Sequence, residues 1–391
     1  MHDETRRAVR GMRTYTRAHH NVPSSTSATV AAWNDVLAAH WRTRMGDHPE
    51  TEEIVSLLKG SLAPSTAENY GGHIARFVRW CDRQPDRPPA LPAATTTVVR
   101  WLVADVVKDD RVRAKSLQPY LSALNRIHRD LEEEEPALGH VLAQVRRGVA
   151  LRQANKGRAT QRVYLPPPIV ERVLLAALAV PDDLLPTPAE CMARPSRVGP
   201  EQIRARLFVQ AATAVVLTFA VFCRGHSGSA LREQDVRRSA AGITVTLDNE
   251  KGKRVEGVAR TITFPPGSVP GLEELLDKWE RLRGPCHDGA SYFAYGRREA
   301  RRSFPATQID TWLQVALDHV GGAQPPAGET WSGHSLRKGA ASGAAAIDVA
   351  FFRICFMGGW AIQSRAVMDY IDATCPATPA CRRFFGWLTR S

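Results

Sequence analysis

One stretch near the middle of the chain, residues 203–222, predicts a helix that other parts of its domain have to enclose. Its second half contains the longest apolar run of the sequence, residues 211–223. A helix that is apolar on all sides is buried, either in a protein core or in a membrane. Thr213 and Thr218 interrupt the run and Arg224 follows it, so it falls short of the roughly 18 consecutive apolar residues of a membrane span. We therefore expect a core helix and a soluble protein.

The chain is basic, which favours a polyanionic partner. Its 391 residues carry a formal net charge of +12, most of it from arginine. The planar guanidinium of arginine suits two-point contact with phosphate, so nucleic acid is the expected partner, and a basic surface without such a partner is the alternative. A hydrophobic content of 43% is enough for two or three domains with cores of their own.

The seven cysteines indicate neither a metal site nor a disulfide framework. Their number is odd, and no two of them form a CxxC pair or a metal-ligand cluster. We interpret them as reduced thiols, which favours an intracellular location, and we expect no metal and no cofactor. The arginine-rich first residues also contain Asp3 and Glu4, so a flexible basic arm is favoured over a transit peptide.

Helical periodicity over residues 51–152 predicts a helical domain, preceded by an N-terminal region of residues 1–50 with one helix over 28–45. Ser65 and Glu68 have the spacing of a capping box at a helix start. Apolar residues then recur at helical spacing in four successive segments. The expected buried sets are Ile74, Phe77, Val78 and Cys81, then Val98, Trp101, Leu102 and Val106, then Leu117, Tyr120, Leu121, Leu124 and Leu131, then Leu138, Val141, Leu142 and Val145.

A basic stretch that ends in three prolines, residues 153–168, is interpreted as an interdomain linker. No acidic residue lies between Glu135 and Glu171. Lysine and arginine here can lie along a phosphate backbone, which gives affinity and salt dependence without reading the base sequence; a solvated spacer is the alternative. The expected DNA contacts in and around the linker are Arg146, Arg147, Arg152, Lys156, Arg158 and Arg162.

The remaining residues, 169–391, predict a second domain that mixes helices with one β-hairpin. Alternating apolar residues and threonines predict strands over residues 243–247 and 261–264. Their connection supplies further candidate DNA contacts, Lys253 and Arg254, beside Lys251. Further helices are expected over residues 169–178, 271–282 and 307–320, and residues 181–201, rich in proline, form a surface insertion.

The segment SGHSLRKGAAS, residues 332–342, predicts a phosphate site. His334 and Arg337 stand three residues apart at the start of an expected helix, so both project from one face. The free N–H groups and positive dipole of a helix N-terminus favour an anion there. Downstream, Gly358 and Gly359 end a second helix.

Two aromatic residues follow these glycines and complete a set of side chains that could catalyse a reaction. Trp360 lies at the turn, and Tyr370 lies on a third amphipathic segment that can pack through Ile362, Ala366 and Val367. A metal-free attack on a phosphodiester needs two arginine clamps, a histidine, an indole donor, a lysine for the leaving oxygen and a tyrosine nucleophile. The chain offers, in order, Arg224, Lys251 or Lys253, His334, Arg337, Trp360 and Tyr370.

Each of these residues also fits a structural role when taken alone. Arg224 can complement a helix C-terminus, Trp360 can anchor packing and Tyr370 can belong to the core. The order and spacing of the whole set favour the catalytic interpretation.

The motifs GHSLRKGAA, FMGGW and AVMDYI resemble the tyrosine recombinase, or phage-integrase, family, and the resemblance extends over residues 51–391. It implies a mainly α fold with a small β-sheet: a helical, SAM-like core-binding domain and a mixed α+β catalytic domain that form a C-shaped clamp on DNA. By motif, Arg224, Lys251, His334, Arg337, Trp360 and Tyr370 match the family's catalytic residues, with Tyr370 as nucleophile and Lys253 as rival to Lys251.

The resemblance implies a site-specific DNA recombinase that breaks and rejoins DNA through a 3′-phosphotyrosyl intermediate, as a tetramer on two DNA sites. The C-terminal residues Phe384, Phe385, Trp387 and Leu388 then dock on a neighbouring subunit or cover their own domain. A type IB topoisomerase and a catalytically silent DNA-binding protein of the same fold are the alternatives. Two departures stand out: Ser227 replaces the usual acidic residue, and the Trp360–Tyr370 interval is one residue longer than in the family members it most resembles.

Overall fold

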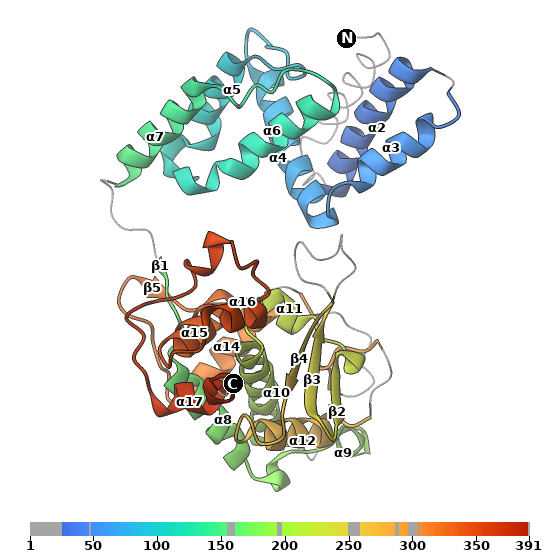
Figure 1. The fold of residues 1–391 in the computed structure, drawn as a ribbon. Helices are drawn as coiled ribbons and strands as arrows, with labels where there is room; N and C mark the ends of the chain where they lie inside the picture. Colours follow the sequence, from blue (N-terminus) through green and yellow to red (C-terminus); the bar gives the residue numbers. More distant parts are fainter. Residues whose placement is uncertain are drawn as a thin grey trace. The chain divides into compact units, whose positions relative to one another are not determined.

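The structure, a computed structural model, divides into two compact units, residues 1–158 and 159–391, each with its own hydrophobic core (Figure 1). The two units are described separately below. The residues that the structure describes are 26–46, 48–154, 161–193, 198–248, 259–285, 289–295, 304–305 and 307–389.

The first unit is helical. Phe77 and Trp101 are fully buried at its centre, with ring centroids 5.0 Å apart. The long helix before residue 50 belongs to this unit, because Val36 lies in the same core and the Trp41 indole donates to the carbonyl of Asp130 at 3.0 Å. Its helices are α2 (Thr26–Met45), α3 (Thr51–Gly60), α4 (Pro64–Arg83), α5 (Thr95–Trp101) with the π-helical turn η1 (Leu102–Val106), α6 (Gln118–Asp130) and α7 (His140–Ala154).

The buried sets predicted for α4 and α5 are confirmed, and two other predictions for this unit are wrong. The helix α4 begins at Pro64, whose missing N–H suits the first helical turn, so Ser65 lies inside the helix and forms no capping box. Leu138 and Val141 are 71% and 56% exposed. Leu138 precedes α7, and the helix faces the core through Leu142 and Val149 instead.

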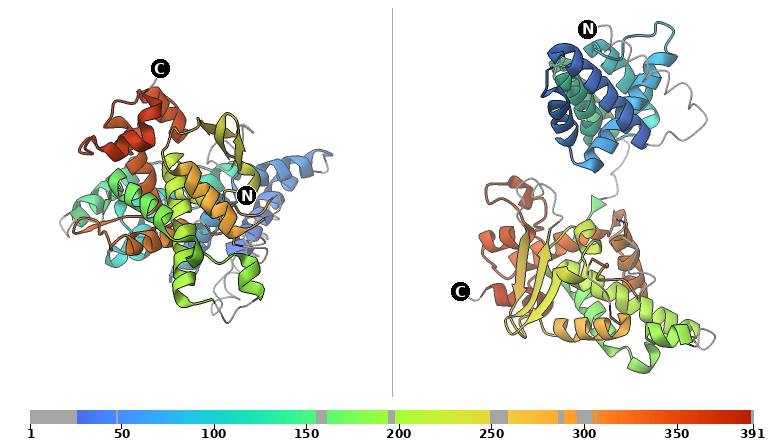
Figure 2. Two further views of the ribbon diagram at one scale, coloured as in Figure 1. Left: turned by 90° about the horizontal axis from the view of Figure 1, so that it is seen from below. Right: turned by 90° about the vertical axis from the view of Figure 1, so that its right-hand side faces the viewer.

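The second unit surrounds α10, the helix predicted to be enclosed. In Figure 1, α10 lies between the strands β3 and β4 on one side and the helices α15 and α17 on the other, and Figure 2 shows the same unit from two further sides. It has the length and apolarity of a membrane span, but 78% of its apolar window is buried inside the unit. The helices are α8 (Pro167–Ala179), α9 (Pro188–Ala193), α10 (Pro200–Ala220), α11 (Gly225–Ser229), α12 (Leu272–Arg283), α14 (Gln308–His319), α15 (Gly333–Ala345), α16 (Phe351–Gly358) and α17 (Pro379–Phe385).

An antiparallel sheet with the strand order β2-β3-β4 forms one side of this unit. The predicted hairpin is confirmed as β3 (Gly242–Leu247) and β4 (Arg260–Phe264), which pair from Ile243 with Phe264 to Leu247 with Arg260. The third strand, β2 (Val236–Ser239), was not predicted, because its sequence VRRS has a single apolar residue and shows no alternation. A short parallel pair, β1 (Gln161–Arg162) and β5 (Glu329–Thr330), leads into α15.

The C-terminal aromatic residues cover their own unit. Phe384 and Phe385 are fully buried, and their rings lie 5.1 Å from Phe219 and 5.0 Å from Phe222 respectively. Leu388 is also buried in this core. Of the two roles considered for this segment, the structure shows the one within the same domain.

Candidate active site

Arg224 is presented by a sharp turn at the end of α10. Phe222 is fully buried and has a φ of 53°, a left-handed conformation of a kind that costs about 1–3 kcal/mol for a residue with a side chain. Its carbonyl accepts from Nη1 of Arg337 at 2.9 Å. The chain then leaves α10, and the half-buried Arg224 stands at the N-cap position of α11.

The N-terminus of α15 is fixed by two backbone donors. Ser332 N donates to Oγ of Ser335 at 3.1 Å, and Gly333 N donates to the Asp310 carboxylate at 2.6 Å. His334 is exposed, whereas Arg337, one turn later, is fully buried. The predicted pair thus lies on one helix face at a helix start.

Two glycines allow α11 and α15 to approach closely. A Cβ on Gly225 would lie 2.5 Å from Cγ2 of Ile309 and 3.1 Å from Cα of Gly333. Since real side chains do not tolerate such distances, only glycine fits at this contact. Arg224 precedes Gly225 and His334 follows Gly333, so this contact brings their backbones to adjoining positions.

Four of the predicted residues form one cluster. The Arg337 guanidinium lies 3.9 Å from the Trp360 ring centroid and 5.1 Å from that of Tyr370. The two aromatic ring centroids are 5.1 Å apart. The Tyr370 hydroxyl lies 3.3 Å from Nδ1 of His334, within reach of a hydrogen bond.

Trp360 is placed by the end of α16. Gly359 ends the helix with a φ of 64°, and Trp360 N donates to the carbonyl of Cys355 at 2.9 Å. The indole lies over Gly358, where a Cβ would come 1.7 Å from the ring. The indole therefore has room beside Arg337 because residue 358 has no side chain.

Tyr370 is held by backbone hydrogen bonds, not by the predicted amphipathic packing. It follows the 3₁₀ turn η7 (Arg365–Val367), Ile362 and Ala366 are exposed, and only Val367 is buried. Oγ of Ser342, on α15, donates to the Tyr370 carbonyl at 3.2 Å and accepts from Asp372 N at 2.8 Å. These bonds orient the hydroxyl toward His334 despite the longer interval from Trp360.

Lys338 supports the same segment through an ion pair with Asp372 at 3.6 Å. Hydrogen bonds from the side chain and the backbone N–H of Thr374, and the charge of Lys338, lower the pKa of the Asp372 carboxyl. The carboxylate therefore stays charged at neutral pH. At the other departure from the family pattern, Ser227 is buried, with its hydroxyl 3.4 Å from Nδ1 of His226.

The remaining predicted site residues divide into two groups. Arg146 and Arg147 lie on α7, and Arg152 forms an ion pair with Asp110 at 3.5 Å. The predictions that lie outside the described residues, or whose side chains do, are Lys156, Arg158, Arg162, Lys251, Lys253 and Arg254.

Sequence reasoning missed Arg260, which is 3% exposed. Nη1 of this arginine donates to the carbonyls of Val221, at 3.2 Å, and Met357. A signal was available, because Arg260 has the same strand parity as the inward residues Ile262 and Phe264.

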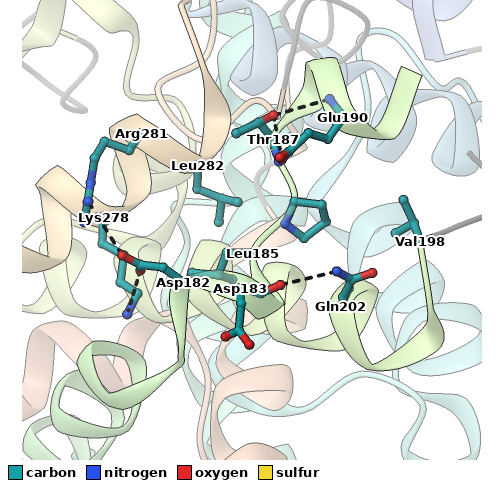
Figure 3. Close-up of a pocket in the computed structure, with 11 residues that line it drawn as sticks. Asp182, Asp183, Leu185, Thr187, Glu190, Val198, Gln202, Lys278, Arg281 and Leu282 are labelled. Atoms are coloured by element: carbon teal, nitrogen blue, oxygen red, sulfur yellow. Dashed lines mark hydrogen bonds and ion pairs between the residues drawn. The ribbon is translucent and has the colours of Figure 1, made fainter. Parts of the chain in front are cut away.

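A pocket of about 670 Å³ lies elsewhere in the second unit, on the insertion whose role the sequence left open (Figure 3). Asp182 forms ion pairs there with Lys278 and Arg281 at 3.6 and 3.7 Å, and Gln202 donates to the carbonyl of Asp183 at 3.4 Å. None of the five candidate catalytic residues that the structure describes lines it.

Comparisons with known proteins identify a fold. No family model and no curated protein matches the sequence. A lambda integrase dimer bound to a COC′ core site is similar in structure, with a TM-score of 0.50, 17% identity and coverage of 80% of this chain and 90% of that one. XerH site-specific recombinase in a post-cleavage complex with palindromic difH substrate gives a TM-score of 0.53, 10% identity and coverage of 98% and 94%.

Proposed function

Since the chain has the fold of the tyrosine recombinases, we propose that it is a site-specific DNA recombinase of that family. The observation that carries the proposal is the cluster in which the Tyr370 hydroxyl faces His334 at 3.3 Å beside the buried guanidinium of Arg337. A nucleophile, a proton acceptor and a phosphate clamp thus come from residues that the motifs align with the family's catalytic set.

The proposed step is an attack of the Tyr370 oxygen on the scissile phosphorus. The O–P bond forms while the bond to the 5′ oxygen breaks, and the electron pair of that bond leaves with the 5′ oxygen. The tyrosine proton passes toward Nδ1 of His334, and Lys251, outside the described residues, protonates the 5′ oxygen. Arg224 and Arg337 neutralise the negative charge that develops on the phosphate oxygens in the transition state, and the Trp360 N–H donates a hydrogen bond to one of these oxygens.

The product is a 3′-phosphotyrosyl link and a free 5′ hydroxyl. Because the phosphoester conserves the energy of the broken bond, a 5′ hydroxyl from a partner strand can reverse the step and complete the exchange without a cofactor. We propose that both units contact duplex DNA, that a homo-tetramer holds two DNA sites, and that the protein acts inside the cell.

Two other functions share this fold. A type IB topoisomerase would relax DNA with the same nucleophile, and a silent DNA-binding protein would bind without cleavage. The approach of Tyr370 to His334 favours the two enzymatic functions over the silent one, since a binding protein needs no such approach.

The test is a covalent protein–DNA adduct. The full chain is incubated with nicked duplexes of randomised sequence, and the DNA that stays attached to the protein after denaturation is amplified and nicked again for the next round of selection. The amount of covalent adduct is measured in each round. We expect an adduct with the wild type and with Tyr164→Phe, a tyrosine of the same unit, but not with Tyr370→Phe. No adduct after repeated selection would exclude both enzymatic functions. An adduct with supercoil relaxation but no exchange between two selected sites would assign a topoisomerase.

A further inference from the structure

We infer that Arg260 is a positioning residue for the proposed cleavage: it ties together the two chain segments that carry Arg224 and Trp360. The inference rests on the proposed function and extends it to a residue that none of the catalytic motifs contains.

Arg260 is the first residue of β4, and its side chain points into the core. It is 3% exposed, and one nitrogen, Nη1, donates to the carbonyls of both Val221 and Met357. Val221 is the C-cap of α10, and Met357 lies in the last turn of α16. One guanidinium therefore joins the C-terminal ends of two helices that are far apart in the sequence.

Both acceptors stand close to the site. Val221 precedes Arg224 by three residues, and Met357 precedes Trp360 by the same interval. The last carbonyls of a helix lack partners within the helix and form the negative end of its dipole. A cation is therefore well suited to hold them, and a loss of this bridge lets the two following segments shift independently.

Arg337 completes the arrangement. It donates to the carbonyl of Phe222, the residue after Val221, and its guanidinium lies against Trp360. Two arginines thus hold successive carbonyls at the turn that presents Arg224. Arg337 is a proposed catalytic residue, whereas Arg260 acts on the site through the backbone.

Lys278 offers a matched control for a purely structural role. It is 8% exposed, and its Nζ donates to the carbonyls of Leu178, at 2.9 Å, and Val180, at the end of α8. It makes the same kind of contact as Arg260, but beside the pocket of Figure 3 and not in the catalytic cluster.

The experiment compares Arg260→Met, Arg260→Lys and Lys278→Met in the full chain, on the nicked duplex obtained from the selection above. DNA affinity and the rate of adduct formation are measured with a normal scissile phosphate and with a methylphosphonate in its place. A methylphosphonate is neutral and develops less negative charge, so its cleavage depends less on correctly placed phosphate clamps.

We expect Arg260→Met to bind DNA within about threefold of the wild type but to form adduct about tenfold to a hundredfold more slowly, the size of effect expected from a misplacement of about 1 Å. On the methylphosphonate we expect the rate of adduct formation by Arg260→Met to lie within about threefold of the wild-type rate on the same substrate. Arg260→Lys keeps the charge but not the planar geometry and is expected to recover only part of the rate. Lys278→Met keeps the wild-type rate on both substrates.

Four outcomes would overturn the inference. Equal rate losses in Arg260→Met and Lys278→Met would assign a general structural role, and so would failure of both Arg260 variants to fold. If Arg260→Met lost as much rate on the methylphosphonate as on the normal phosphate, Arg260 would not act by positioning the arginines that contact the phosphate. A fully active Arg260→Lys would mean that the charge alone matters and not the geometry of the bridge. If the wild type forms no adduct, the proposed function fails and the inference fails with it; an active wild type with any of the four results sinks the inference alone.

Discussion

At the scale of single residues, the glycine at position 358 sets the position of the Trp360 indole. A Cβ there would lie 1.7 Å from the ring, and the indole is itself the neighbour of the Arg337 guanidinium at 3.9 Å. The absence of a side chain at residue 358 is therefore necessary for the indole to lie beside Arg337.

We expect Gly358→Ala to displace the indole and slow adduct formation by about tenfold or more, as for other misplaced catalytic groups. DNA affinity should stay near that of the wild type, which a gel-shift titration would measure beside the adduct assay. Gly60→Ala is the control, because a Cβ at Gly60 meets nothing within 4 Å. A Gly358→Ala protein with the wild-type rate would contradict this account of Trp360.

His128 gives the helical unit a dependence on pH. The ring is fully buried, Nε2 accepts from Ala93 N at 2.7 Å, and Nδ1 lies 2.7 Å from the carbonyl of Leu124. Because Nε2 has to accept, the ring is neutral in the folded state, and burial lowers its pKa. In the unfolded chain the ring takes up a proton near the ordinary histidine pKa of about 6.5.

The stability that the buried, neutral His128 contributes to the folded unit is therefore fully present above about pH 6.5. It is lost as the pH falls below that value, since the unfolded state then binds the proton more readily. We expect the urea concentration at the unfolding midpoint of the first unit to decrease as the pH is lowered from neutral to about pH 5. In His128→Gln that dependence should flatten, whereas in His140→Gln, which changes an exposed ring, it should remain. Parallel pH profiles for His128→Gln and the wild type would contradict this origin.

At the scale of elements, α15 organises the candidate site from both ends. Its first two turns carry His334 and Arg337, and its third turn carries Ser342, which holds the backbone of Tyr370 and Asp372. One helix thus fixes the distance between the proposed proton acceptor and the proposed nucleophile.

Ser342→Ala removes both contacts and leaves two backbone groups without this partner. We expect a loss of about 1–3 kcal/mol in unfolding free energy and adduct formation slower by about tenfold or more. Thr213→Val is the control, since it removes a fully buried hydroxyl that bonds only within α10 in the described contacts. Equal rates in the two variants, at similar stability loss, would rule out a positioning role for Ser342.

At the scale of the whole molecule, two units share a net charge of +12. If both contact the phosphate backbone, as proposed, bound counterions are released on binding and affinity falls steeply with salt. For six to ten phosphate contacts we expect roughly a thousandfold or greater loss between about 50 and 200 mM salt, measured by fluorescence anisotropy of a labelled duplex. Affinity that is insensitive to salt would contradict the phosphate contacts.

Local patterns predicted much of the fold correctly. Apolar spacing placed α4, α5, α8, α10, α12 and α14, and the alternation of apolar residues with threonines placed the β3–β4 hairpin. The failures were also local: the capping box at Ser65, the buried face of α7 and the amphipathic segment around Tyr370. Pro64 starts α4 one residue before Ser65, and in the other two failures contacts with other elements outweighed a weak pattern.

By itself, the sequence determined the order of the candidate catalytic residues and the position of His334 and Arg337 at the start of one helix, because periodicity and motif spacing depend on near neighbours. Only the tertiary structure decided that the Tyr370 hydroxyl faces His334, although Tyr370 does not lie on a helix. It also decided the contacts of Arg260, whose acceptors lie 39 and 97 positions away. Such partners follow from how buried polar groups satisfy one another across the whole core, and no local pattern encodes that choice.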